Sequence, residues 1–463
     1  MLPSLVLLFA VTLLFFSNAP SASSAIVKTL PGFDGFLPFH LETGYITVDE
    51  ENNGQLFYYF IKSERNPEED PLLTWISGGP GCSSFFGLAF EIGPLHFDIK
   101  KYDGEIPKLV LHPYSWTKVS NILFIDIPIG AGFSFARGSE PYMGGDIKSS
   151  KQVYKFIRKW LDEHPQFLLN PLYIGGDSYS GKLIPVITNE VIEDIEAGLA
   201  PPLNLKGYVI GNPIMDPRLD TNALIPYVHR MGFISDELYE SAMKSCMGDF
   251  QHFSNLKCAN DINVICRCIS GINEQFILEP KCLQGYFDCP TRKLNDRRSL
   301  MDRSIELTTP SIVPNPKCRE YGYLLVEYWA NNETVREALH TQKGMTKAWE
   351  YCTRSLPYVT DIPSGLPYLI NISTRGYHAL LYSGDHDMVS TYLVAQEALT
   401  LLNSSIVDDW RPWSVDGQVA GFTRSYANNL TFALIKGGGH TTPENRPEEC
   451  YAMFERWISH KPL

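Results

Sequence analysis

Short apolar runs alternate with helix-length segments along most of this chain, and this alternation limits its possible folds more than any other feature. The strand-length runs lie at 72–76, 122–127, 172–174, 207–210, 379–382 and 430–435. Runs that are apolar at consecutive positions suit central strands buried on both faces of a sheet. Two segments, 149–163 and 181–197, carry apolar residues at roughly helical spacing. We therefore expect an α/β fold with a mostly parallel sheet and helical crossovers.

The entry to this sheet and one interruption of it can also be placed. Runs 44–48 and 55–61 are rich in β-forming residues and flank the turn sequence at 52–54, which predicts an antiparallel hairpin. The alternation stops from about residue 213 to residue 327, where most of the cysteines lie. We predict a core over 26–212, an insertion or cap over 213–327, and the return of the core over 328–463.

The composition indicates a globular protein and argues against two classes of partner. The chain has 463 residues, of which 44% are hydrophobic, so it has ample material for a core. Its formal net charge is −13, which argues against nucleic acid or an anionic membrane as the main partner.

The N-terminus resembles a secretory signal peptide over residues 1–25. An apolar run from Leu5 to Phe16 precedes small residues, and Ser23 and Ala25 have the spacing that signal peptidase requires. The run is too short to span a bilayer comfortably, so we expect cleavage after Ala25 and no remaining anchor. Four glycosylation sequons agree with a secretory route, at Asn332, Asn371, Asn403 and Asn429.

The ten cysteines also suit an oxidising compartment, and seven of them fall between Cys246 and Cys318. No pair of C-x-x-C units at zinc spacing is present, which favours disulfides over metal binding. The same region holds a basic cluster at Arg292, Lys293, Arg297, Arg298 and Arg303. We interpret this cluster as part of a solvated surface loop. The alternative is a proteolytic processing site, and cleavage there would give a two-chain form in place of a single-chain monomer.

Residues 174–181, IGGDSYSG, place Ser178 after a strand-like run and before a helix-like one. The sequence resembles the G-x-S-x-G elbow of serine hydrolases, except that Ser180 occupies the fifth position and the glycine follows at Gly181. Small residues are needed there because the turn is tight and a helix packs behind it. Ser178 is therefore the candidate nucleophile.

The acid and the base should follow later in the chain. Run 379–382 leads into Ser-Gly-Asp-His-Asp, where Asp387 is the favoured acid and Asp385 the alternative. Run 430–435 leads into three glycines and His440, which can swing its ring to Ser178. The histidine would take the serine proton, and the aspartate would hold the imidazole in one tautomer and stabilise the imidazolium.

An oxyanion site completes the arrangement. One donor should be the backbone N–H of Tyr179, and the other should come from the glycine-rich loop at 77–82, with Gly79 as the expected donor. Side chains and backbone groups supply every role, so we expect no metal and no organic cofactor.

Four motifs together resemble the serine carboxypeptidase family, peptidase S10: GGPGCSS at 78–84, GDSYSG at 176–181, GDHDM at 384–388 and GGGHTTPENRP at 437–447. The resemblance implies an α/β-hydrolase fold with a helical, disulfide-rich insertion, and a triad of Ser178, Asp387 and His440. It also implies the disulfides Cys82–Cys352, Cys246–Cys258 and Cys282–Cys318. Cys266, Cys268, Cys289 and Cys450 remain unassigned. A vacuolar or extracellular destination is implied in the same way.

Two departures bear on the substrate. Members that act as carboxypeptidases usually have Asn-Gly-Gly-Pro-Gly and Gly-Glu-Ser-Tyr-Ala-Gly, and the asparagine and glutamate belong to the set that holds the peptide's terminal carboxylate. Those positions are Ser77 and Asp177 in this chain. The same set would include Gly78 and Glu91. Shorter side chains should loosen a clamp whose groups must lie at hydrogen-bond distance.

The motifs with Ser77, GDSYSG and GDHDM are instead similar to the plant serine carboxypeptidase-like acyltransferases, such as the sinapoylglucose-dependent enzymes. That branch implies transfer of an acyl group from a 1-O-acyl-β-glucose donor to an alcohol acceptor. A serine carboxypeptidase or esterase is the second hypothesis, and a catalytically silent binding protein on the same fold is the third.

Overall fold

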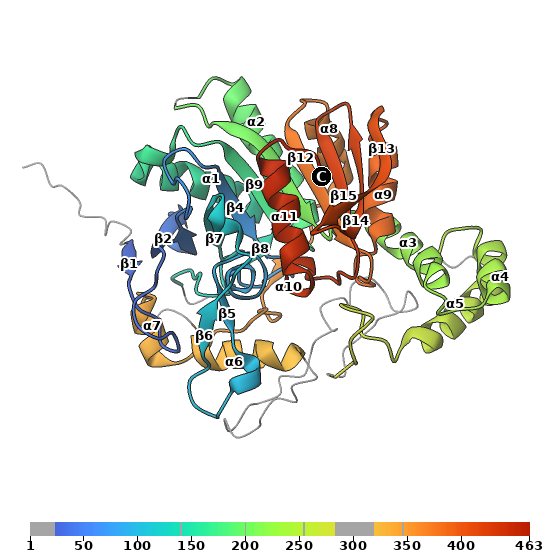
Figure 1. Ribbon diagram of the computed structural model, residues 1–463, viewed down its shortest axis with the longest axis horizontal. Coiled ribbons are helices and arrows are strands. Elements are labelled where there is room, and N and C mark those ends of the chain that lie inside the picture. The colour runs from blue at the N-terminus through green and yellow to red at the C-terminus, as the bar shows by residue number, and fades with distance from the viewer. Residues whose placement is uncertain (1–23, 139–140, 200, 253–254, 283–318, 345–346) are drawn as a thin grey trace, which may run out of the picture.

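The computed structural model describes residues 24–138, 141–199, 201–252, 255–282, 319–344 and 347–463. At its centre lies an 11-stranded sheet (Figure 1). In spatial order the strands are β1 (Ala25–Val27), β2 (Leu41–Asp49), β3 (Gly54–Ile61), β7 (Asn121–Ile125), β4 (Leu72–Ile76), β9 (Leu172–Asp177), β10 (Leu205–Gly211), β12 (His378–Gly384), β15 (Leu430–Ile435), β14 (Gln418–Tyr426) and β13 (Ile406–Val415). Two small sheets pair β5 (Leu95–Phe97) with β6 (Leu109–Leu111), and β8 (Gly144–Gly145) with β11 (Tyr358–Val359).

The sheet is parallel in its middle and antiparallel at both edges. Strands β7, β4, β9, β10, β12 and β15 run parallel to one another in this order. The hairpin β2–β3 and the following pair β3–β7 are antiparallel. The expected fold class and the entry hairpin are thus confirmed. The antiparallel pair β13–β14 was not predicted, because β13 mixes charged residues with apolar ones and is mostly exposed.

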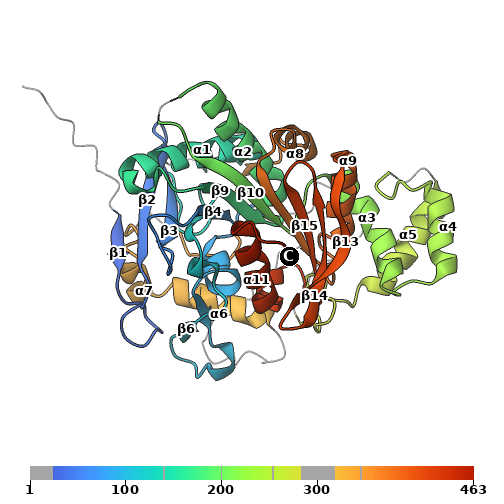
Figure 2. The same ribbon diagram turned by 45° about the horizontal axis from the view of Figure 1, so that its top comes forward.

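Alternate residues of the middle strands enter two apolar layers. On β4, Leu72 and Ile76 face one layer, whereas Leu73 and Trp75 face the other. Helices α1 (Asp146–Glu163), α2 (Ser180–Glu196), α8 (Leu366–Ser373) and α9 (Tyr392–Leu401) share the first layer, and α11 (Pro447–Ile458) covers the opposite face (Figures 1 and 2). Burial on both faces explains why these strands are continuously apolar.

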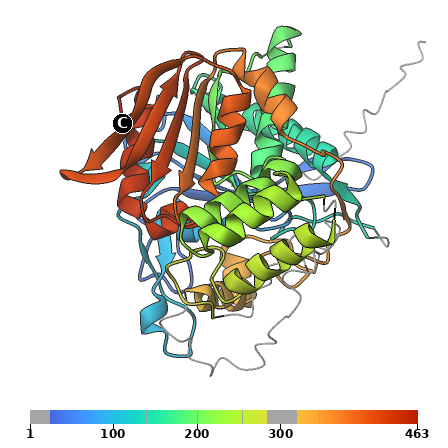
Figure 3. The same cartoon turned by 90° about the vertical axis from the view of Figure 1, so that its right-hand side faces the viewer.

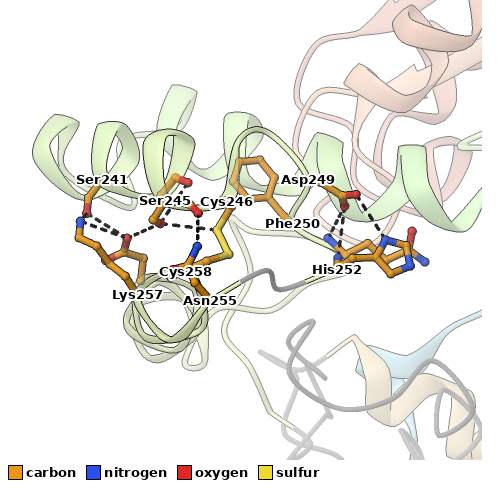
Figure 4. The surroundings of a disulfide bond; sticks show 12 residues. Ser241, Ser245, Cys246, Asp249, Phe250, His252, Asn255, Lys257 and Cys258 are labelled. Atoms are coloured by element: carbon orange, nitrogen blue, oxygen red, sulfur yellow. Dashed lines mark hydrogen bonds and ion pairs between the residues drawn. A yellow bond between two sulfur atoms is a disulfide. The ribbon is translucent and has the colours of Figure 1, made fainter.

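The insertion contains helices that project beyond the sheet. Helices α3 (Pro217–Arg230), α4 (Asp236–Cys246) and α5 (Leu256–Ile269) lie together beside the sheet (Figure 3), and their buried side chains form a separate apolar cluster. The Cys246–Cys258 disulfide joins α4 to α5 (Figure 4). By contrast, α6 (Glu320–Ala330) and α7 (Glu333–Ala338) pack Val326, Trp329 and Val335 into the cluster on the α11 side of the sheet. Val326 lies at the end of the predicted insertion, so this end contributes to the core, whereas Trp329 and Val335 belong to the predicted return of the core.

The structure tests part of the cysteine and surface predictions. The Cys82–Cys352 and Cys246–Cys258 bonds are confirmed. Cys282 is disulfide-bonded, as is Cys266, but Cys318 and Cys289 lie outside the described residues, as do the basic cluster and residues 1–23 of the predicted leader. Cys268 and Cys450 are free thiols.

The sequons lie at the surface. Asn371, Asn403 and Asn429 are exposed, and Asn332 is half-buried at the start of α7. Within the ranges that the structure describes, no helix is both long enough and apolar enough to cross a membrane.

One buried ion pair fastens α1 to the edge hairpin. His164 Nε2 lies 2.8 Å from Glu42 Oε1, and the Tyr58 hydroxyl donates to the same carboxylate at 2.7 Å. Burial opposes charge on His164, but the Glu42 carboxylate prevails and raises the histidine pKa. Burial likewise opposes charge on Glu42, yet hydrogen bonds led by His164 lower its pKa. Both groups are therefore charged at mildly acidic pH.

Replacing His164 by glutamine should lower the free energy of unfolding mainly at mildly acidic pH. The histidine contributes fully below its unfolded pKa of about 6.5, and its contribution is lost as pH rises through the higher folded value. The glutamate contributes above about pH 4.3, and its contribution is lost as pH falls through the lower folded value. We expect a loss of about 2–3 kcal/mol near pH 5.5 and a smaller one at pH 9, measured by urea denaturation. The same change at His229, whose partner Asp236 is exposed, is the control; an equal loss at both pH values for His164→Gln would refute the assignment.

Candidate active site

Ser178 lies at the tight turn between β9 and α2. Its φ of +56° is in the left-handed region, which is unusual for a residue with a side chain. The turn is held by the Ser178 N–H, which donates to Gly211 O at 2.9 Å, and by the Gly181 N–H, which donates to Ser178 O at 2.9 Å. This backbone presents the hydroxyl at the end of the sheet, as expected for a nucleophile elbow.

The displaced glycine of this elbow has a steric explanation. A Cβ at position 181 would lie 2.7 Å from Pro213 Cβ and 2.8 Å from Ile214 O, so only glycine fits there. Ser180 is fully buried and is accommodated. In this chain the close approach falls one residue later than in the G-x-S-x-G pattern.

The three predicted triad residues lie together. His440 Nε2 is 2.8 Å from Ser178 Oγ, and His440 Nδ1 is 2.8 Å from Asp387 Oδ2. Asp387 has no exposed surface, and its other oxygen accepts the N–H groups of Val389 at 2.8 Å and Ser390 at 3.1 Å. With the acid bound at Nδ1, the neutral imidazole keeps its proton there and presents an acceptor at Nε2 to the serine hydroxyl.

Asp385, the alternative acid, has a different role. Its Oδ1 accepts the N–H of Gly437 and contacts His386 Nδ1 in a short hydrogen bond. The His386 backbone N–H donates to Gly438 O at 2.8 Å. These contacts join the acid-bearing loop to the glycines before His440, and His386 takes part in shaping that loop.

The glycine-rich loop lies directly against the nucleophile. A Cβ at Gly78 would approach Ser178 Cβ to 2.7 Å and the Tyr179 backbone nitrogen to 2.7 Å. The Cys82–Cys352 disulfide fixes the far end of the loop. Gly79, the predicted donor, follows at φ +118°, and the predicted Tyr179 donor is on the turn itself. A small cavity between this loop and α2 is lined in part by Ser77, Gly78, Tyr179, Leu183 and Tyr358.

Tyr179 is anchored by a buried acid that sequence reasoning missed. Its hydroxyl donates to Asp146 Oδ1 at 2.8 Å, and the Tyr358 hydroxyl donates to the same oxygen at 2.8 Å. Lys182 Nζ lies 3.8 Å from Asp146 Oδ2, and both side chains are buried. The network ties Tyr179, which carries one predicted oxyanion donor, to the start of α1.

Two further acids lie buried near the nucleophile. Burial raises the pKa of Asp177 to about 7, although His440 and backbone N–H groups, including that of Gly78, favour its charged form. Burial, and then Asp177, hold the pKa of Glu91 well above its usual range. Among the described residues, neither Asp177 Oδ1 nor the Ser77 hydroxyl has a hydrogen-bond partner, whereas the Glu91 carboxylate interacts with the Trp75 side chain. The predicted substrate-site residues Ser77 and Asp177 thus offer unpaired polar groups.

The insertion contributes to the triad through residues 274–277, here called the strap. The His440 N–H donates to Gln275 O at 2.6 Å, and the Met388 N–H donates to Glu274 O at 2.9 Å. The Ile277 N–H donates to His386 O at 3.2 Å. Sequence reasoning did not identify the strap, because its backbone groups carry no residue signature.

A second missed residue is Asn212, which follows β10 and contacts Asp387. Its place after a strand run, at the same sheet edge as the triad, is the signal that could have indicated it. Across the part of the chain that the structure describes, no three histidine, cysteine, aspartate or glutamate side chains are grouped so that they could hold a metal ion.

The protonation of His440 should govern the pH dependence. Burial disfavours the imidazolium, but Asp387 and then Asp177 favour it, and the net effect raises the pKa of His440. Since the base must be neutral, kcat/KM for p-nitrophenyl acetate should fall on the acid side with a midpoint above about pH 6.5. Asp177→Asn should move that midpoint to lower pH, whereas Asp236→Asn, on the exposed face of α4, should not. An unchanged midpoint in Asp177→Asn would contradict this electrostatic coupling.

Comparisons with known proteins agree with this geometry. Residues 31–460 match the family described as serine carboxypeptidase, Peptidase S10. The chain is 47% identical over 458 residues to serine carboxypeptidase-like 7 of Arabidopsis thaliana, covering 98% of each chain, and 46% identical to serine carboxypeptidase-like 19 of the same plant, covering 99% of each. Among solved structures, the chain is similar to Kex1Δp, a prohormone-processing carboxypeptidase from Saccharomyces cerevisiae. The two structures superpose with a TM-score of 0.68 at 19% sequence identity, and the match covers 91% of this chain and 92% of that chain. The chain therefore belongs to the serine carboxypeptidase family and has its α/β-hydrolase fold.

Proposed function

We propose that this protein is an acyltransferase that moves an acyl group of the phenolic class from a 1-O-acyl-β-glucose ester to an alcohol acceptor. The observation that carries the proposal is the pair Ser77 and Asp177. Both are buried beside the nucleophile, at the positions where carboxypeptidases of this family hold a peptide's terminal carboxylate with longer side chains.

The chemistry of these groups supports a sugar ester as donor. An asparagine amide offers two N–H donors, which suit a carboxylate, whereas a serine hydroxyl donates one hydrogen bond and also accepts. With a pKa raised to about 7, Asp177 is largely protonated at mildly acidic pH and can donate as well. Groups that both donate and accept match the hydroxyls of an uncharged glucose leaving group.

The proposed reaction has two balanced halves. Ser178 Oγ attacks the acyl carbon while His440 Nε2 takes the hydroxyl proton, and the N–H groups of Gly79 and Tyr179 bind the oxyanion. The bond from the acyl carbon to the glucose oxygen then breaks, and His440 returns the proton to glucose. In the second half the acceptor alcohol gives its proton to His440, attacks the acyl-serine, and releases Ser178 with its proton restored.

Transfer requires that the alcohol outcompete water for the acyl-enzyme. Orientation can provide this advantage, because well-placed reactants reach effective molarities of about 10⁵ M or more. A serine carboxypeptidase or esterase is the second candidate function. It is favoured by the retained carboxyl pair of Glu91 and Asp177, which a peptidase could use for a terminal carboxylate.

A single incubation separates the two functions. Purified protein is mixed at mildly acidic pH with a panel of phenolic acylglucoses and alcohols from the source tissue, beside a blocked dipeptide, and the products are analysed by mass spectrometry. We expect a new acyl ester and free glucose, and a loss of about 10⁴-fold or more in Ser178→Ala. Ser180→Ala is the control for the nucleophile.

Efficient dipeptide cleavage without acyl exchange would reject the transferase. A wild type that fails to react with a fluorophosphonate would instead favour a silent binding protein.

Restoring the longer clamp should shift the balance toward peptides. In Ser77→Asn combined with Asp177→Glu, each regained hydrogen bond to a carboxylate should favour peptide binding, so dipeptide hydrolysis relative to acyl transfer should rise about 10-fold or more. The ratio of the two rates in one mixed assay measures this, with each single variant alongside. If the ratio is unchanged in a folded double variant, these positions do not set the donor class.

We also propose that the protein enters the secretory pathway and resides in the vacuole or outside the cell. The apolar leader, the exposed sequons and the disulfides support this route. The proposed partners are the small-molecule acyl-glucose donor and the alcohol acceptor.

A further inference from the structure

Asn212 lies at the junction of the loops that carry the triad. It follows β10 directly, its side chain is buried, and its φ of +41° is in the left-handed region that asparagine tolerates better than most residues. Its backbone N–H donates to Tyr382 O on the neighbouring strand β12 at 2.8 Å. The backbone thus fixes the side chain at the edge of the sheet where β10 and β12 end.

The amide connects the acid loop to the histidine loop. Asn212 Nδ2 donates to Asp387 Oδ2 at 2.8 Å and to Gly439 O, the carbonyl before His440, at 3.2 Å. The carboxylate oxygen that it contacts is the one that binds His440 Nδ1. One side chain therefore holds both the acceptor of the histidine proton and the backbone that carries the histidine.

The orientation of this amide is determined by its neighbours. Only its NH₂ end can face a carboxylate, so its oxygen must point the other way. That oxygen accepts from Thr442 Oγ1 at 2.7 Å, and Thr442 is fully buried. Thr442 Oγ1 also lies 2.6 Å from Gly439 O, and its single hydrogen can serve only one of the two acceptors at a time.

We propose that Asn212 is a positioning residue of the triad. It holds Asp387 Oδ2 and the His440 loop in register, so that Nδ1 keeps its proton and Nε2 remains directed at Ser178. A neutral donor suits this place, because a cation would weaken the attraction of Asp387 for the imidazolium that forms during the reaction. The inference rests on the proposed acyl chemistry at Ser178, but not on the identity of the donor or acceptor.

The test uses Asn212→Asp, which keeps the size and the backbone preference but replaces the donor with a carboxyl group. At neutral pH the two carboxyls repel, whereas at low pH the introduced carboxyl is protonated and can donate to Asp387 again. We expect kcat for p-nitrophenyl acetate to fall about 100-fold relative to wild type at pH 8 but only about 10-fold at pH 5. KM should stay within about twofold of wild type, as for a group that acts on the chemical step. The rate of fluorophosphonate labelling of Ser178 should follow kcat.

Two further variants keep the test decisive. Asn170→Asp is the matched control: Asn170 is also buried, it lies before β9 whereas Ser178 follows the other end of that strand, and it donates to the backbone carbonyls of Pro67 and Asp70. Its kcat relative to wild type should not vary with pH. Thr442→Val removes the hydroxyl that orients the amide and should lower kcat by about 3- to 10-fold, which keeps the test open if Asn212→Asp does not fold. A pH-independent ratio for Asn212→Asp, an effect on KM alone, or wild-type labelling in Thr442→Val would overturn the proposal.

These assays use probes that report on Ser178 alone. Failure of the proposed acyl transfer would appear as a lack of reaction with acylglucoses while p-nitrophenyl acetate is still turned over. Failure of the Asn212 proposal would appear in the pH ratio whatever the donor is.

Discussion

The parallel pairing of β9, β10, β12 and β15 is the constraint on which the site depends. Parallel strands end at the same edge of a sheet, so the loops that follow them meet there even when they are far apart in sequence. Ser178, Asn212, Asp387 and His440 each follow one of these strands. The core on either face keeps the strands in register, and the distances between the reacting groups follow from that register.

The insertion acts on this edge as well as projecting away from it. The strap accepts the backbone N–H of His440 and that of Met388, and it donates to His386, so it bridges both loops that carry the triad partners. The Tyr227 hydroxyl on α3 adds a hydrogen bond to Asp385 O at 3.0 Å. Backbone hydrogen bonds of this kind are insensitive to side-chain identity, which leaves the insertion free to vary in sequence while it still supports the site.

Buried acids surround the nucleophile in several distinct roles. Asp387 accepts hydrogen bonds from four donors, whereas Asp146 anchors two tyrosines beside the predicted oxyanion turn. Asp177 and Glu91 have raised pKa values, because burial penalises their charged forms, and within the described residues Asp177 Oδ1 has no hydrogen-bond partner. Unpaired buried polar groups are costly in a folded protein. Asp177 directly precedes Ser178, so a substrate bound at the nucleophile can pair with its free oxygen.

Much of this protein is determined by local sequence. Continuous apolar runs specify strands buried on both faces, and the glycines around Ser178 and before His440 mark tight turns, so the fold class, Ser178, His440 and the loop that carries the acid follow from the sequence. The β13–β14 pair did not follow from the sequence, because the mixture of charged and apolar residues in β13 resembles the sequence of a loop. Only the tertiary structure decided that Asp387, and not Asp385, faces His440, and that Asn212, Asp146 and the strap support the site. The physical reason is that these roles arise from contacts across the ends of neighbouring strands, and periodicity and turn residues describe only the chain's local conformation.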